Sequence, residues 1–152
     1  MSSYRGINNR NPLNCKTNGA NEWAGCVGVD ELGHCVFAHE MYSVRAACRN
    51  LAQYQKWGAN TLAKIFAIYA PSDDPNAHNQ PNDYAAFVAA RVGHAADSFF
   101  SLFSDPGGHV LDPSLLADVI NAMIEFENFS GLRYPQETII SGIIMYEKDF
   151  VT

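Results

Sequence analysis

The chain carries little charge and has fewer basic than acidic residues. Of its 152 residues 17% are charged, and 16 acidic residues against 10 basic ones give a formal net charge of -6. A nucleic-acid-binding domain normally has a basic surplus, so we expect no nucleic-acid partner. The hydrophobic share of 47% excludes an intrinsically disordered chain and supplies enough apolar material for one packed domain over residues 1–152.

Long apolar runs are also missing from the sequence. No stretch approaches the roughly 18 apolar residues that indicate a membrane-spanning helix, so we expect no membrane insertion. Residues 1–14 are polar and rich in Asn, without the apolar stretch of a secretory signal peptide. We therefore expect synthesis in the cytoplasm and, for any export, a carrier other than a general secretory signal.

The cysteines lack the spacing of a metal site. Cys15, Cys26, Cys35 and Cys48 lie 11, 9 and 13 residues apart, whereas zinc sites usually contain C-x2–4-C pairs, and we expect neither a metal nor another cofactor. Two interpretations remain open, namely disulfides formed in an oxidising compartment and buried free thiols. A catalytic Cys35 is disfavoured, because the adjacent His34 would point to the opposite face of a strand.

Local signals predict a mostly helical chain with one β-hairpin. Turn-forming residues fill the Asn-rich segment 1–22 and indicate a loop, and residues 23–38 predict a hairpin that turns at 30–33. Helices are expected to begin near Ser43, Thr61, Asn82, Asp112 and Pro135. They are expected to end before Gly58, Pro71, Gly93 and Gly131. The predicted fold class is α+β, dominated by five or six helices.

The helix predicted after Asp112 carries the best candidate for acid catalysis. At 100° per residue, Leu116, Ile120, Met123 and Glu127 share one face, whereas Glu125 lies opposite them. Apolar surroundings raise the pKa of a carboxyl group and allow it to donate a proton near neutral pH. Glu127 is therefore the candidate general acid. The alternative is that the helix ends one residue earlier and Glu127 points into solvent.

Further candidate residues border the predicted hairpin and helices. The acids that could act as a partner carboxylate, or else be solvated loop or turn residues, are Glu22, Asp30 and Glu40. The aromatic residues that could stack on sugar rings, or else belong to the core, are Trp23, Phe37, Tyr54, Tyr69 and Tyr84.

Residues 5–14, RGINNRNPLN, resemble the RGI-x-NNNP-(G/L)-N opening of a family of small phage and prophage virion-associated proteins in the lysozyme-like superfamily. Further matches follow in the family's order at Trp23-Ala-Gly25, Val36-Phe37, Arg45-Ala46, Leu51 with Tyr54, Thr61 with Ile65, Ala70-Pro71, Tyr84 with Val88 and Gly93, and Glu127-Asn128. Tyr69 replaces the family's Trp before Ala-Pro. The resemblance covers residues 5–131 and implies a lysozyme-like fold, and it supports Glu127 as a catalytic residue.

The resemblance also suggests a substrate and its binding residues. The side chains expected to bind a glycan are Asn9, Asn11, Trp23, Phe37, Tyr69, Tyr84 and Asn128. A weaker likeness is to bacterial N-acetylglucosaminidases that cleave peptidoglycan, with the Asn-rich segment and the catalytic helix in circularly permuted order. The family's Glu-Asn pair after Ala-Pro is missing here, so that either Asp73 or Asp74 substitutes for it or activity is lost.

These patterns lead to one main hypothesis and two alternatives. The main hypothesis is a peptidoglycan glycosidase in which Glu127 is the general acid, assisted by a second carboxylate or by the substrate's acetamido group. Arg45, Arg49 and Lys64 are expected to offset the negative charge at its groove. The alternatives are a non-catalytic virion structural or glycan-binding protein and a cysteine amidase. The expected partners are peptidoglycan strands, a virion or secretion-system component, and an inhibitor protein.

Overall fold

The computed structural model describes residues 4–17, 23–70, 80–105 and 107–151. These residues form six α-helices and a two-stranded antiparallel sheet, which confirms the predicted mostly helical α+β class. The helices are α1 (Arg5–Asn8), α2 (Glu40–Lys56), α3 (Leu62–Tyr69), α4 (Pro81–Val92), α5 (Pro113–Glu127) and α6 (Gln136–Phe150). Within these residues, no helix combines the length and the apolar character needed to cross a membrane.

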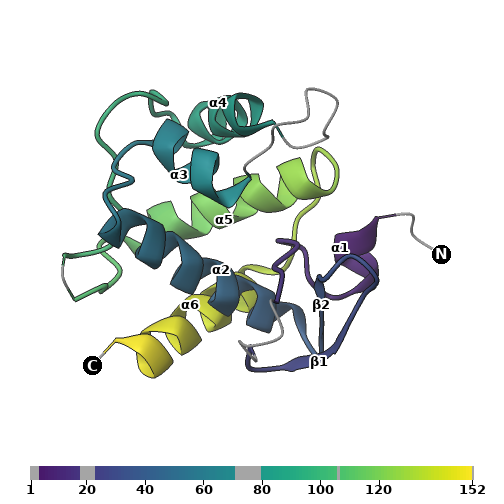
Figure 1. The fold of residues 1–152 in the computed structure, drawn as a ribbon. Coiled ribbons are helices and arrows are strands. Elements are labelled where there is room, and N and C mark those ends of the chain that lie inside the picture. The colour runs from purple at the N-terminus through teal and green to yellow at the C-terminus, as the bar shows by residue number, and fades with distance from the viewer. Residues whose placement is uncertain (1–3, 18–22, 71–79, 106, 152) are drawn as a thin grey trace.

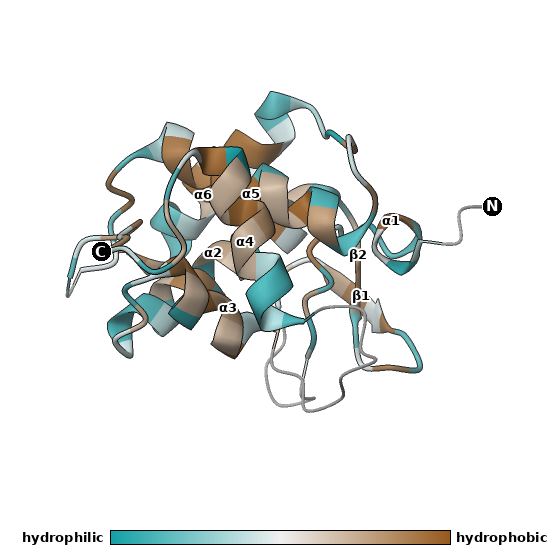
Figure 2. Cartoon of the chain, turned by 90° about the horizontal axis from the view of Figure 1, so that it is seen from above, coloured by the Kyte–Doolittle hydropathy of each residue, from teal (hydrophilic) through white to brown (hydrophobic). Residues whose placement is uncertain are grey.

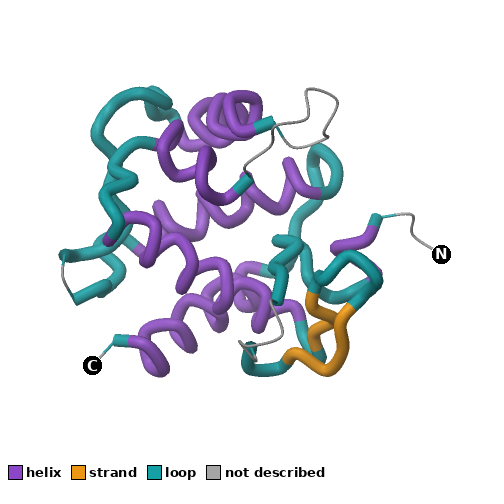
Figure 3. The backbone as a smooth tube through the Cα atoms, in the orientation of Figure 1, coloured by secondary structure: helices purple, strands orange, loops and turns teal. Residues whose placement is uncertain are grey.

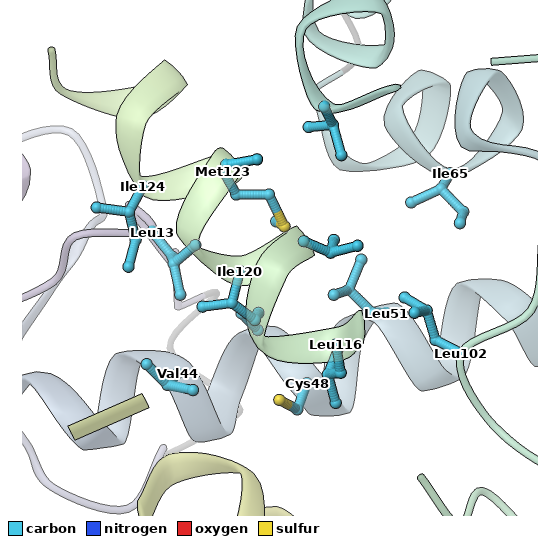
Figure 4. Packing of buried hydrophobic residues seen from close by; sticks show 14 of the residues in the cluster. Leu13, Val44, Cys48, Leu51, Ile65, Leu102, Leu116, Ile120, Met123 and Ile124 are labelled. Atoms are coloured by element: carbon cyan, nitrogen blue, oxygen red, sulfur yellow. The ribbon is translucent and has the colours of Figure 1, made fainter. Parts of the chain in front are cut away.

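Helix α5 occupies the middle of the fold. It packs against α4 on one side and α6 on the other, while α2 packs along α6 and contacts α3 (Figure 1). Nine of the 15 residues of α5 are buried. Figure 4 shows the apolar side chains of this helix above α2, among them Leu116, Ile120, Met123 and Ile124, with Val44, Cys48 and Leu51 from α2 and Leu13 from the N-terminal segment.

Close packing of α2 and α6 depends on a glycine. A Cβ atom added at Gly142 would lie 2.5 Å from the Val44 Cβ and 2.8 Å from the Met41 carbonyl oxygen, both on α2. The missing side chain therefore allows the two helices to approach.

Hydrophobic residues are concentrated on the central helices, α5 among them, as Figure 2 shows.

The hairpin lies at one end of the helical body (Figure 3). Its strands β1 (Cys26–Val29) and β2 (Cys35–Phe37) pair with Gly28 opposite Val36 and Val29 opposite Cys35, which confirms the predicted hairpin. The N-terminal segment extends the pairing, because the Cys35 N–H donates to the Cys15 carbonyl at 3.0 Å and Lys16 bridges His34.

Several helix boundaries follow the predicted capping chemistry. The Thr61 hydroxyl accepts from the Lys64 N–H at 3.1 Å, the Asp112 carboxylate accepts from two N–H groups of the first turn of α5, and Gly93 ends α4 in the left-handed region.

Two expectations about local structure were wrong. Helix α2 begins at Glu40 with His39 as its cap, so Ser43 is a buried residue inside the helix. The segment predicted as a loop contains the one-turn helix α1. In both places contacts with distant residues outweigh the local signal, since the Ser43 hydroxyl is bonded to Asn11 and Gly6 of α1 packs against Asn128.

Candidate active site

The N-terminal segment joins the hairpin to α2 through one buried amide. Asn11 is fully buried, and its Nδ2 donates to the carbonyls of Cys15 and Cys35 at 2.9 Å each. Its Oδ1 accepts from the Cys15 N–H at 3.0 Å and from the Ser43 hydroxyl at 2.7 Å. Because these bonds use the amide fully and no face is exposed, the expectation that Asn11 binds substrate was wrong. The residue holds the site's framework together.

The same segment is fastened to the end of α5. Asn128 is 7% exposed, and its Nδ2 donates at 2.9 Å to the carbonyls of Pro12 and Ile124. A Cβ at Gly6 would lie 2.7 Å from the Asn128 Oδ1, so glycine permits this close approach. The proposed glycan-binding role of Asn128 therefore does not fit its position, because the side chain is buried between two parts of the chain.

Glu127 is the last residue of α5 and is half-buried. Its Oε1 accepts a 2.8 Å hydrogen bond from the Nδ2 of Asn14, a residue held in the left-handed region at a φ of 52°. The Tyr84 hydroxyl donates to the Met123 carbonyl at 3.5 Å, and burial, followed by the Glu127 charge, raises the pKa of Tyr84 well above its usual value. Asn14, which the sequence patterns did not single out, thus belongs to the site.

Tyr69 of α3 also contacts the N-terminal segment. Its hydroxyl donates to the Leu13 carbonyl at 2.5 Å. Burial raises the pKa of Tyr69 well above its usual value, and the charges of Cys15 and Glu127 add smaller contributions in the same direction. Its ring contacts that of Tyr84 edge-on with centroids 5.8 Å apart. Glu127 therefore accepts a hydrogen bond from an uncharged amide, and its charge acts on two tyrosines nearby.

Glu125, on the opposite face of α5, is buried, with a side chain that is 3% exposed. Arg91 of α4 approaches its carboxylate at 3.2 Å, Arg133 at 3.4 Å, and the Gly131 N–H donates to it at 3.1 Å. Burial alone would raise the pKa of Glu125, but these partners together lower it. The face of α5 that carries Glu125 is buried because α4 and the segment after α5 cover it.

Asp30 is an ionised turn residue. Its side chain, 9% exposed, accepts from Arg5 Nη1 at 2.8 Å and from Asn9 Nδ2 at 2.9 Å. Burial alone would raise the pKa of Asp30, but this pKa lies well below its usual range. The cause is the hydrogen bonds that Asp30 accepts from Arg5, from the His34 and Leu32 N–H groups and from Asn9. Asp30 is thus unsuited to donate a proton, and the Asn9 amide is already used within the protein.

Glu40 is the remaining candidate acid that lies within the described residues. Glu40 lies half-buried in the first turn of α2, and its charge raises the pKa of Tyr134 after the larger effect of burial. Glu22, Asp73 and Asp74 lie outside the described residues.

The candidate sugar-binding aromatics divide into buried and accessible ones. Phe37 is 1% exposed and Tyr84 is fully buried, with its ring stacked on Phe66 at 4.4 Å, so neither offers a free face to a sugar. Both assignments were wrong because these rings serve the core. Trp23 and Tyr69 are half-buried, and the Trp23 indole N–H donates to the Lys16 carbonyl at 3.1 Å.

The expected basic side chains do not gather beside Glu127. Arg45 is 8% exposed and pairs with Asp149 of α6 at 2.8 Å, and both Arg45 and Arg49 lie over the Phe150 ring. Arg49 also lines a pocket of about 160 Å³ between α2, α6 and residues 103–105 and 107–108. The Lys64 ammonium is exposed and donates to Asn60 at 3.2 Å.

All four cysteines are free thiols, which decides between the two interpretations of their spacing. Burial raises the pKa of Cys15 to about 12 and also raises the pKa of Cys35 and Cys48. Because the thiolate is the nucleophile, these environments disfavour cysteine catalysis. Among the described residues, no group of three or more Cys, His, Asp or Glu is arranged to hold a metal ion.

The thiols are expected to differ in reactivity. In the folded protein at about pH 8, a disulfide reagent should modify the half-buried Cys26 well before Cys15, Cys35 and Cys48, because thiolate formation and access are both suppressed by burial. Peptide mapping by mass spectrometry measures the order, and a urea-unfolded sample, in which all four should react, is the control. Equal rates in the folded protein would contradict the assignment.

Neither a protein-family model nor a curated protein matches the chain.

Proposed function

We propose that this protein is a peptidoglycan-degrading glycosidase in which Glu127 protonates the glycosidic oxygen of the bond that is cut. The observation that carries the proposal is the position of Glu127, which is half-buried at the end of the central helix α5 and accepts a 2.8 Å hydrogen bond from Asn14 of the Asn-rich segment. Asp30 and Glu125 are less suited to give up a proton, because each is ion-paired with an arginine and has a lowered pKa, which favours the ionised form.

The chemistry requires one proton and one stabilised positive charge. Glu127 gives its proton to the leaving sugar oxygen as the glycosidic bond breaks, and the positive charge that develops on the sugar ring is stabilised by a second group. Because Asp30 is ion-paired with Arg5, the group that we propose for that role is the substrate's acetamido oxygen. The Glu127 carboxylate then takes a proton from the incoming water molecule.

The fold and the route of delivery form part of the same proposal. A mainly helical body with one small hairpin, and a glutamate at the end of a buried helix fastened to the Asn-rich segment, are compatible with a lysozyme-like fold. The resemblance to virion-associated proteins supports delivery to the cell wall by a phage particle or secretion system, where an inhibitor protein is a further expected partner.

The test uses purified cell-wall sacculi. The purified protein should clear a suspension of sacculi, and mass spectrometry of the soluble products should show new sugar ends with stem peptides still attached. Stem peptides freed from the sugars would instead indicate an amidase. Sedimentation of the protein with sacculi that remain intact would contradict the glycosidase and favour the non-catalytic glycan-binding alternative.

A further inference from the structure

A row of aromatic rings runs from the surface to Glu127. The Trp57 ring lies 5.9 Å from that of Tyr54, which lies 6.4 Å from Tyr69, which in turn lies 5.8 Å from Tyr84. The Tyr69 hydroxyl donates to the Leu13 carbonyl, and the next residue along the chain, Asn14, donates to the Glu127 carboxyl group at 2.8 Å. The row crosses from α2 to α3 and α4, so residues from three helices contribute to a single continuous feature.

Exposure falls along this row towards Glu127. Trp57 is 66% exposed, Tyr54 and Tyr69 are half-buried, and Tyr84 is fully buried. If these rings served only the core, the last one would also be buried. The exposed Trp57 indole does not gain the free energy that burial would give. The outer end of the row is therefore suited to contact another molecule.

The position of Trp57 is fixed by the backbone. It is the C-terminal cap of α2, where its N–H donates to the Gln53 carbonyl at 3.0 Å, and Gly58 turns the chain away with a φ of 101°. On one side, the indole packs against Tyr54 with 33° between the ring planes. A ring anchored in this way loses little conformational entropy when a ligand covers it.

We propose that Trp57, supported by Tyr54, is an outer subsite that stacks on a sugar ring of the same glycan strand whose scissile bond lies at Glu127. This inference rests on the function proposed above. The C–H groups on one face of a pyranose ring carry partial positive charge, which complements the negative face of an indole, while the sugar hydroxyls stay in water. Two ring-to-ring distances, of 5.9 and 6.4 Å, separate Trp57 from Tyr69, so a ligand that covers Trp57 and also reaches Glu127 is a polymer rather than a single sugar.

Binding is tested in the absence of cleavage. In the Glu127→Gln background, Trp57→Ala should weaken binding to sacculi in a sedimentation assay by about tenfold, whereas Trp57→Tyr should retain part of the affinity. The matched control is Ile144→Ala on α6, which removes an apolar side chain that is 59% exposed and outside the row. Both alanine variants should keep the unfolding temperature of the parent, because both side chains are mostly exposed.

Cleavage supplies the second readout. With Glu127 intact, Trp57→Ala should raise the KM for long glycan strands and leave kcat, and the KM for short oligosaccharides, unchanged. Unaltered binding and KM in Trp57→Ala, while the wild-type protein clears sacculi, would overturn the subsite and leave the proposed glycosidase intact. Trp57-dependent binding without cleavage by the wild-type protein would support the subsite and contradict the glycosidase. Failure of the parent to bind sacculi would overturn the subsite.

Discussion

Glu127→Gln is expected to slow the clearing of sacculi by about 10²- to 10⁴-fold, the usual contribution of a general acid. The glutamine amide keeps the size of the side chain and an oxygen that can accept the Asn14 hydrogen bond, which measures 2.8 Å in the native protein. It has no acidic proton to give to the leaving sugar oxygen. The rate loss, followed by turbidity, should therefore occur without unfolding, which circular dichroism checks.

Asp118→Asn provides the matched control for that experiment. Asp118 lies on the same helix as Glu127 but is exposed, so the variant makes the same change of charge away from the site. It should clear sacculi at the wild-type rate. Equal activity of the Glu127 variant and this control would remove Glu127 from the catalytic role.

Asn11→Ala is expected to cause the largest loss of stability, about 3–5 kcal/mol, because several buried polar groups lose their partners at once. The groups left without the Asn11 amide are the carbonyls of Cys15 and Cys35, the Cys15 N–H and the Ser43 hydroxyl. Each unpaired buried group costs about 1–3 kcal/mol, although such costs do not add fully. Urea unfolding followed by tryptophan fluorescence measures the change in the free energy of unfolding.

Asn9→Ala is the control for position 11. Asn9 is half-buried, and its amide donates to Asp30, which keeps the Arg5 guanidinium and two backbone N–H groups as donors. We expect a loss of about 0.5–1.5 kcal/mol, the usual net contribution of one hydrogen bond. Similar losses in the two variants would contradict the central structural role given to Asn11.

The features predicted well from sequence are those decided by neighbouring residues. A hairpin turn around Asp30 and helix ends at Thr61, Asp112 and Gly93 depend on side chains within a few positions of the backbone groups they bind. Ser43 has the same capping chemistry as Thr61, yet it lies inside α2, because its hydroxyl is bonded to Asn11. The local signal could not show that this more distant partner is available.

The site was predictable in part for the same reason. Helical spacing was enough to single out Glu127, but the packing of α4 against α5, which buries Glu125, follows from tertiary structure alone. An asparagine side chain can bind a ligand or form hydrogen bonds with the backbone of its own chain. The residue type alone does not distinguish these two roles. The roles of Asn11, Asn14 and Asn128 therefore became clear only when their partners could be seen.

The hydrogen bond between Asn14 and Glu127 also has a consequence for the order of events during synthesis. Its two ends are separated by 113 positions along the chain. A ribosome must release the chain beyond position 127 before the donor can meet the carboxyl group, and closing so long a loop carries an entropic cost that grows with its length. In a nascent chain the two halves of this pair therefore stay apart until Glu127 has left the ribosome.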